Sequence, residues 1–122
     1  MKVRLATFNL ENLDSGPKAS APVEARFSVL RPQLARLNAD VLCFQEVNAQ
    51  RILSAEPRSL DALNQLLADS PYRNFHRLGT AHDDGSLLDK HNLVIISSSG
   101  CLWRPQCGER RSTLKDSACR SR

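Results

Sequence analysis

The stretch VLCFQEVN, Val41–Asn48, decides the fold and raises the question of function. Its four apolar residues, VLCF, run directly into Gln45 and Glu46. A run that is apolar on both faces predicts a strand buried on both sides within a covered sheet. An ionised carboxylate at the end of such a strand is costly unless a positive charge or hydrogen bonds compensate it. Glu46 is therefore the first candidate functional residue.

Length and composition place the chain among ordinary soluble proteins. With 122 residues, 41% of them hydrophobic and 25% charged, the sequence is large enough for one small domain. No stretch approaches the roughly 20 apolar residues of a membrane span. The first residues, MKVRLATFNLENL, contain no apolar core followed by a cleavage site, so no secretory signal is evident. We expect a cytoplasmic protein with reduced thiols and no membrane partner.

The net charge of +4 is distributed unevenly. Residues 1–97 carry equal numbers of basic and acidic side chains, so the whole excess lies in residues 98–122. This tail has no apolar periodicity, and it holds three of the four cysteines, Cys101, Cys107 and Cys119. Their spacing lacks the short paired intervals of a zinc site. We expect a basic tail that is disordered or encoded out of frame.

Hydrophobic periodicity predicts alternating strands and helices in the rest of the chain. Apolar residues at helical spacing indicate a helix whose course Pro32 interrupts and which Asn38 ends as a C-cap. The predicted order is a strand at residues 2–9, a loop at 10–22, a helix at 23–37, a strand at 40–45, a helix at 60–68, a strand at 72–80, a polar loop at 81–91 and a strand at 92–97. This order is typical of an α/β fold.

Two polar residues end predicted strands, Asn9 the first and Glu46 the second. A helix between these strands makes them parallel, and open α/β sheets place their chemistry at the carboxyl ends of strands. A carboxylate beside an amide suits Mg²⁺, which takes one or two carboxylates and keeps several waters. A strand-end carboxylate can equally be exposed and hydrogen-bonded to loop amides. Spacing alone leaves both interpretations open.

Several stretches together resemble one known family. ATFNLENL (residues 6–13), LRPQLARLNADVLCFQEVN (residues 30–48), YRNFH and DKHNLVIIS are similar to the start of the endonuclease/exonuclease/phosphatase superfamily. That family includes pancreatic deoxyribonuclease, the exonuclease-III-type repair nucleases and the inositol polyphosphate 5-phosphatases. In it, one strand ends in Asn and a later apolar strand ends in Gln-Glu, as at Asn9 and Glu46. The resemblance covers residues 1–97.

The resemblance implies a fold and a chemistry. The fold would be α/β: the N-terminal half of a two-sheet α/β sandwich with outer helices, over residues 1–97. The activity would be hydrolysis of a phosphate ester, nucleic acid among the candidates, with Mg²⁺, or Mn²⁺ in its place. By this resemblance Glu46 would hold the metal, and Asn9 would belong to both the catalytic and the metal-binding set. Gln45 would support the Glu46 loop through hydrogen bonds.

The departures from the family pattern also carry information. The family's later Gly-Asp-x-Asn and Ser-Asp-His segments, which include its water-activating His, do not occur here. We therefore expect a domain truncated by a frameshift or premature end near Ser98, inactive as written. The alternative is a non-catalytic fragment whose basic tail binds nucleic acid loosely. The sequence identifies neither the phosphate-ester substrate nor the oligomeric state.

Other polar residues have simpler interpretations. We expect the three histidines to be surface or strand-end residues and the three aspartates of residues 81–91 to be solvated. We expect Cys43 to be a small core residue, and the adjacent pair of arginines in the tail to be part of a charged tail. These residues are His76, His82, His91, Asp83, Asp84, Asp89, Cys43, Arg110 and Arg111.

Overall fold

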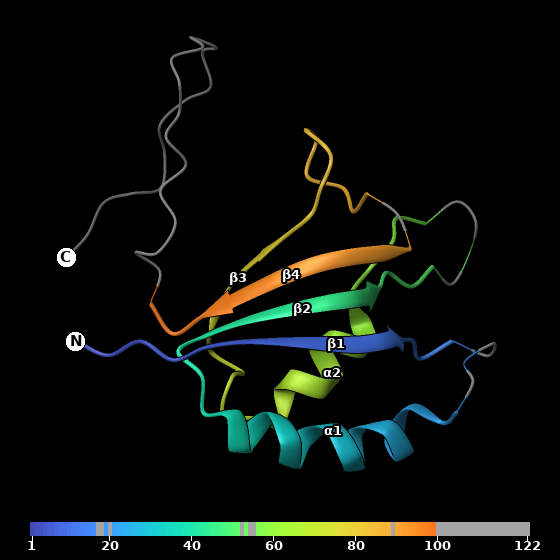
Figure 1. The fold of residues 1–122 in the computed structure, drawn as a ribbon. Helices are drawn as coiled ribbons and strands as arrows, with labels where there is room; N and C mark the ends of the chain where they lie inside the picture. The colour runs from blue at the N-terminus through green and yellow to red at the C-terminus, as the bar shows by residue number, and fades with distance from the viewer. Residues whose placement is uncertain (17–18, 20, 52, 54–55, 89, 100–122) are drawn as a thin grey trace, which may run out of the picture.

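The computed structural model describes residues 1–16, 19, 21–51, 53, 56–88 and 90–99. These residues form a small α/β fold with one mixed sheet and two helices (Figure 1). The elements are β1 (Leu5–Leu13), α1 (Val23–Leu37), β2 (Val41–Asn48), α2 (Asp61–Ala68), β3 (His76–Gly79) and β4 (His91–Ser97). The strand order is β1-β2-β4-β3, in which β1 and β2 are parallel and the other neighbours antiparallel.

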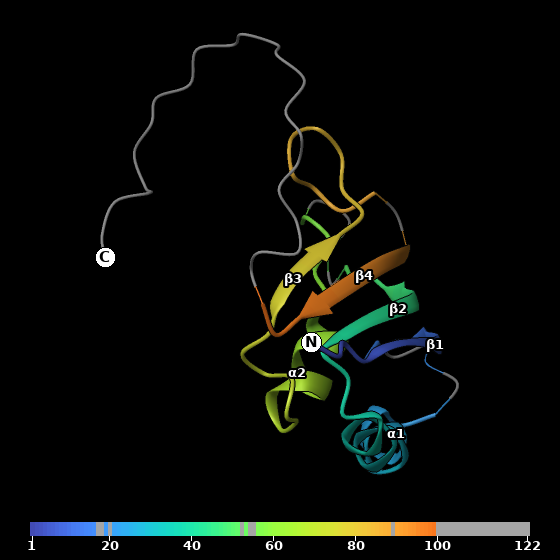
Figure 2. The ribbon, with the colours of Figure 1, turned by 60° about the vertical axis from the view of Figure 1, so that its left-hand side comes forward.

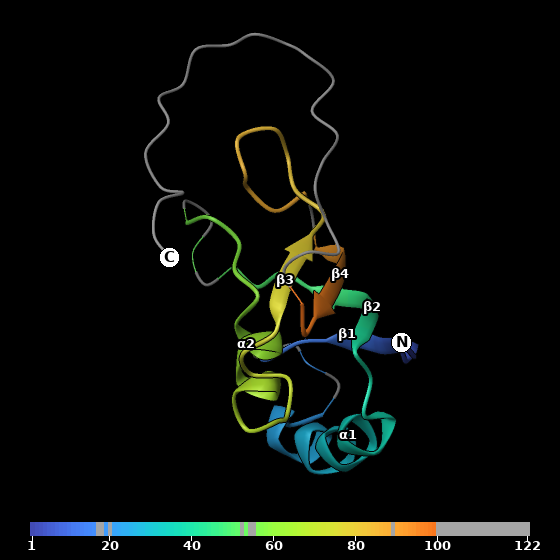
Figure 3. The same cartoon turned by 90° about the vertical axis from the view of Figure 1, so that its left-hand side faces the viewer.

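Both helices lie on the same face of the sheet (Figures 2 and 3). The core fills the space between helices and sheet, because the apolar stripe of each helix faces alternate residues of β2 and β4. Its largest fully buried side chains include Phe27, Leu34, Leu42, Phe44, Leu63, Leu66, Val94 and Ile96. None of the helices described is long and apolar enough to cross a membrane.

The opposite face of the sheet carries apolar side chains that nothing covers within the described residues. Leu5 is 65% exposed, Leu93 56% and Ile95 42%. Cys43 is only half-buried, so its prediction as a core residue is wrong, and β2 is not buried on both faces. The reason is that both helices pack on one side. A second sheet, which the sandwich prediction requires, stays a prediction.

Helix α1 has the bounds that the sequence predicts. The helix does not restart at Pro32, because α1 is continuous from Val23 to Leu37, and a kink at Pro32 stays a prediction. Pro32 is exposed on the solvent side of the helix. Asn38 ends the helix in the left-handed conformation, with φ 43° and ψ 48°, as its prediction as a C-cap requires.

The bounds of every strand differ from prediction, and those of β1, β2 and β3 differ most. β1 continues past Asn9 to Leu13, and β2 continues past Gln45 to Asn48. β3 is confined to His76–Gly79, because residues 71–74 form a turn. In that turn Tyr72 is buried, and its hydroxyl binds the backbone where α1 ends. Residues 100–122, including the three tail cysteines, lie outside the described residues.

Candidate functional site

Asn9 and Glu46 come together where the regular pairing of the two parallel strands ends, in the carboxyl-terminal halves of β1 and β2. The register pairs Asn9 with Gln45, the residue before Glu46. The Asn9 Nδ2 group donates a hydrogen bond of 3.0 Å to Glu46 Oε1. The predicted convergence of the two side chains is therefore confirmed. Metal binding by either residue stays a prediction.

A β-bulge determines where the Glu46 side chain points. Phe44 pairs with Val94, and Val47 pairs with Asn92. Between these pairs, two residues of β2 lie opposite one residue of β4, which is a β-bulge. Glu46 takes up the extra length with a positive φ of 54°. In a regular pleat Glu46 would follow Phe44 onto the core face. The bulge gives that position to Val47, which is fully buried, and leaves Glu46 partly exposed.

The end of β1 is also irregular. Between the pairs Asn9–Gln45 and Leu13–Val47 the register shifts, and Glu11 and Asn12 have φ values of 46° and 55°. The Glu11 backbone N–H donates to Asn9 Oδ1 at 2.7 Å, which forms an Asx turn. Both ends of the Asn9 amide are therefore engaged, the oxygen by its own strand and the nitrogen by Glu46.

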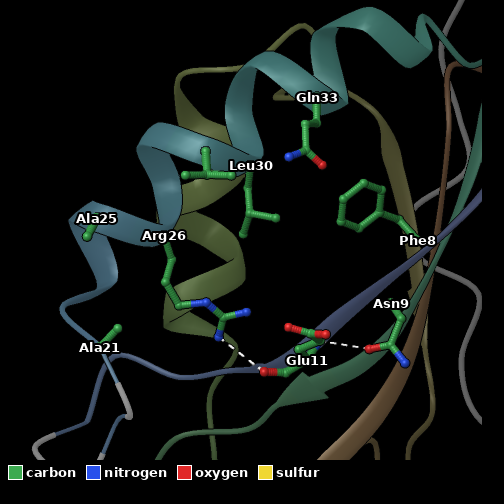
Figure 4. Close-up of a pocket in the computed structure, with 9 residues that line it drawn as sticks. Phe8, Asn9, Glu11, Ala21, Ala25, Arg26, Leu30 and Gln33 are labelled. Atoms are coloured by element: carbon green, nitrogen blue, oxygen red, sulfur yellow. Dashed lines mark hydrogen bonds between the residues drawn. The ribbon is translucent and has the colours of Figure 1, made fainter.

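Arg26 approaches the same segment from α1. Its Nη1 group donates to the carbonyl oxygens of Glu11 and Asn12, each at 3.2 Å, and its Nη2 group donates to that of Leu10. Figure 4 shows this guanidinium beside Glu11 and Asn9, at the edge of a cleft of about 490 Å³ between β1 and α1. No motif in the sequence singles out Arg26, because its partners are backbone atoms.

Two polar residues that the sequence does not single out follow Glu46. Asn48 ends β2, and Gln50 comes two residues later. Asn48 is 2% exposed, and its Oδ1 atom is a buried acceptor without a hydrogen-bond partner among the described residues. Gln50 Nε2 donates to the Asn48 carbonyl at 2.8 Å, and its Oε1 accepts from the Ala62 amide at 3.2 Å. The Gln50 side chain therefore bridges two backbone segments. Gln45, which was predicted to support the Glu46 loop through hydrogen bonds, has an exposed side chain.

The donor set at this site consists of one carboxylate, that of Glu46, with the Asn9 amide hydrogen-bonded to it. Among the residues described, no cluster of three or more His, Cys, Asp or Glu side chains could hold a metal ion. That excludes a tetrahedral zinc site built from described residues. Mg²⁺ takes one or two carboxylates and keeps most of its waters. Glu46 is a carboxylate of this kind, whereas Asn9 turns its nitrogen toward Glu46 and its oxygen toward the Glu11 amide. The orphaned Asn48 oxygen, so close in sequence to Glu46, is an acceptor that an ordered water could satisfy.

A second, larger cavity of about 880 Å³ lies beyond the same strand ends. Residues that follow β1 and β2 line it, Asp14 and Gln50 among them, together with the first residue of α2. Its basic lining residues are Arg51, Arg58 and Lys90. Its acidic lining residues are Asp14 and Asp61, so charges of both signs lie beyond the ends of the parallel strands.

The other candidate residues behave as surface groups. His76, His82 and His91 are exposed, and Asp83 and Asp84 lie in an exposed loop, as predicted. The side chain and backbone of Ser86 donate hydrogen bonds to Asp84, which lowers the pKa of that carboxyl group. Asp89, Cys101, Cys107, Cys119, Arg110 and Arg111 lie outside the described residues.

Comparison with known proteins leaves the chain without an assigned family. No protein-family model matches it, and neither curated proteins nor solved structures give a significant match.

Proposed function

We propose that Asn9 and Glu46 belong to a divalent-metal site for the hydrolysis of phosphate esters. The observation that carries the proposal is the hydrogen bond between Asn9 Nδ2 and Glu46 Oε1 at the ends of β1 and β2. Support also comes from the backbone, since Glu46 has a positive φ in a bulge. Conformations of this kind cost free energy and cluster at functional sites.

Each residue has a distinct role in this proposal. Glu46 supplies the carboxylate oxygen that holds Mg²⁺ or Mn²⁺. Asn9 positions that carboxylate, because its Nδ2 group fixes one oxygen while its own oxygen is held by the Glu11 amide. The earlier assignment of Asn9 as a direct metal ligand stays a prediction. A bound divalent cation would stabilise negative charge on the phosphoryl oxygens.

The basic residues near the site support an anionic substrate in this proposal. Phosphate esters are anionic, and the cavity beyond the same strand ends is lined by Arg51, Arg58 and Lys90 as well as by Asp14 and Asp61, so basic residues exceed acidic ones there by one. Guanidinium and ammonium groups bind phosphate through charge-assisted hydrogen bonds. Nucleic acid is one member of this class. Since the sequence contains neither Gly-Asp-x-Asn nor Ser-Asp-His, we expect the 122-residue chain to bind metal but to hydrolyse esters slowly.

The experiment uses the paramagnetic ion Mn²⁺ with the complete ¹⁵N-labelled chain. Substoichiometric Mn²⁺ should broaden the amide signals of Asn9, Glu11 and Glu46 before those of α2. Glu46→Gln keeps the shape of the side chain and removes its charge, so the selective broadening should disappear. Glu24→Gln is the matched control, because Glu24 is an exposed carboxylate on α1.

The outcome can contradict the proposal in two ways. Equal broadening in wild type and Glu46→Gln would show that Mn²⁺ binds elsewhere. No selective broadening at millimolar Mn²⁺ would show that the pair is not a metal site. The same samples should be assayed with Mg²⁺ on a simple phosphodiester and on plasmid DNA. Any turnover that belongs to this site must be lost in Glu46→Gln and kept in Glu24→Gln.

A further inference from the structure

Arg26 makes an unusual set of contacts for a helix side chain. Its guanidinium donates to three consecutive backbone carbonyls, those of Leu10, Glu11 and Asn12. All three belong to the last residues of β1, at the position where the register with β2 shifts. A guanidinium offers several N–H donors in a rigid fork, so one side chain can satisfy a whole irregular turn.

The segment that Arg26 holds is strained. Glu11 and Asn12 both adopt the left-handed backbone conformation. Asparagine tolerates this conformation but glutamate rarely occupies it, so the strain lies at Glu11. Such conformations persist only where surrounding contacts enforce them. The three carbonyl contacts from Arg26 are contacts of that kind, and they come from a different element.

A continuous path of hydrogen bonds joins this segment to the candidate site. The Glu11 carbonyl accepts from Arg26, and the Glu11 amide donates to Asn9 Oδ1 at 2.7 Å. Asn9 in turn donates to Glu46 Oε1 at 3.0 Å. Orientation of the Asn9 amide therefore depends on the turn, and the turn depends on Arg26.

We propose that Arg26 is a positioning residue, which clamps residues 10–12 so that Asn9 presents its Nδ2 group to Glu46. The catalytic meaning of this role rests on the proposed function, whereas the structural link between Arg26 and Asn9 does not. Arg26 acts through Asn9 and needs no contact with metal or substrate.

A second arginine on the same helix provides a matched comparison. Arg31 also donates to backbone carbonyls, those of Gln65 at 2.9 Å and Leu66 at 3.4 Å. These carbonyls belong to α2, and Arg31 also pairs with Asp69 at 3.4 Å. Loss of Arg31 therefore removes the same kind of contact from α1 without touching the end of β1.

The test compares Arg26→Ala, Arg26→Lys and Arg31→Ala in the complete ¹⁵N-labelled chain. In Arg26→Ala the Asn9 side-chain NH₂ signals should shift, and hydrogen exchange at the Glu11 amide should accelerate about tenfold, as expected for loss of charge-assisted hydrogen bonds. Exchange at the Leu42 amide, in the central strand, reports any change in global stability. Arg26→Lys keeps the charge but not the fork, so we expect a smaller shift in the same direction.

Each outcome decides one question. Unchanged Asn9 and Glu11 signals in Arg26→Lys and in a folded Arg26→Ala would overturn the positioning role. Equal changes in Arg31→Ala would overturn it too, because general loosening of α1 would then explain the effect. Selective Mn²⁺ broadening should weaken several-fold in Arg26→Ala. If wild type shows no such broadening, the proposed function fails, while the Asn9 and Glu11 signals still decide the role of Arg26.

Discussion

Asn9 and Glu46 are 37 residues apart in the sequence, yet Asn9 Nδ2 donates to Glu46 Oε1 at 3.0 Å. The contact is possible because α1 returns the chain to a strand parallel to β1. It also needs an irregular backbone on both sides, a bulge at Glu46 and a turn after Asn9. The parallel pairing of β1 and β2 brings the two residues to one edge, and the local irregularities direct their side chains toward each other.

The variant Asn9→Asp tests this contact through stability. It replaces a donor by a second carboxylate at hydrogen-bonding distance from Glu46, and two unit charges about 4 Å apart in water repel by about 1 kcal/mol. In a domain of this size that repulsion should lower the melting temperature by about 4–8 °C at pH 8 in EDTA. Millimolar Mg²⁺ should restore it if the pair forms a cation site.

The control for this variant is Asn12→Asp, which adds the same charge to the same strand. Asn12 is exposed, and none of the hydrogen bonds found links its side chain to Glu46 within the described part of the chain. Its melting temperature should change by less than that of Asn9→Asp. A melting temperature for Asn9→Asp that is unaffected by Mg²⁺ would count against the cation site.

Tyr72→Phe should destabilise the fold without changing its packing. The Tyr72 hydroxyl donates to the Leu34 carbonyl at 2.8 Å and accepts from the Ala39 amide at 3.1 Å. It thus joins the end of α1 to the start of β2. Phe keeps the ring but leaves a buried N–H and C=O unpaired, which costs about 1–3 kcal/mol. Urea unfolding should show a lower midpoint with an unchanged slope, whereas an unchanged midpoint would mean that water replaces the hydroxyl.

Strong periodicity made several elements predictable from the sequence. The spacing of Leu60, Leu63 and Leu67 predicts α2, and the run NLVIIS predicts β4. Asn38 was identified as a C-cap because asparagine tolerates the left-handed conformation. These features depend on local sequence or on one apolar face, so no knowledge of distant partners was needed.

The rest of the site depends on tertiary structure. The bulge at Glu46 exists because Val47 fills the core position that regular pleating would give to the carboxylate. Arg26 could not be identified, because its partners are carbonyl groups that every residue has. The prediction that β2 is buried on both faces is also wrong. An apolar run shows that both faces of a strand can be buried, but it does not show which helix or sheet packs on each face.

The turn at Asp84 gives a prediction about pH. Ser86 donates to Asp84 Oδ1 from its hydroxyl at 2.6 Å and from its amide at 2.9 Å, so the carboxyl pKa lies below its ordinary value of 3.8. The stabilisation is therefore present above pH 3.8 and is lost as the pH falls through the lowered pKa. Ser86→Ala should raise the pKa toward its ordinary value, measured by ¹³C carboxyl titration. Ser70→Ala should leave it unchanged; equal titration curves in wild type and Ser86→Ala would contradict the assigned cause.

The uncovered sheet face can be tested with two adjacent residues of β4. Ile95 is 42% exposed on that face, where Cys43 and Leu78 are its cross-strand neighbours, and Ile96 is 1% exposed on the core face. Contiguous exposed apolar side chains favour association, and threonine keeps the preference for strands. Ile95→Thr should therefore reduce light scattering at high concentration while changing the free energy of unfolding by less than about 1 kcal/mol.

The control is Ile96→Thr, which should lower the free energy of unfolding by more than about 2 kcal/mol, because it leaves a cavity and buries a hydroxyl group. If Ile95→Thr destabilises the chain as much as Ile96→Thr does, that face is packed against something in solution.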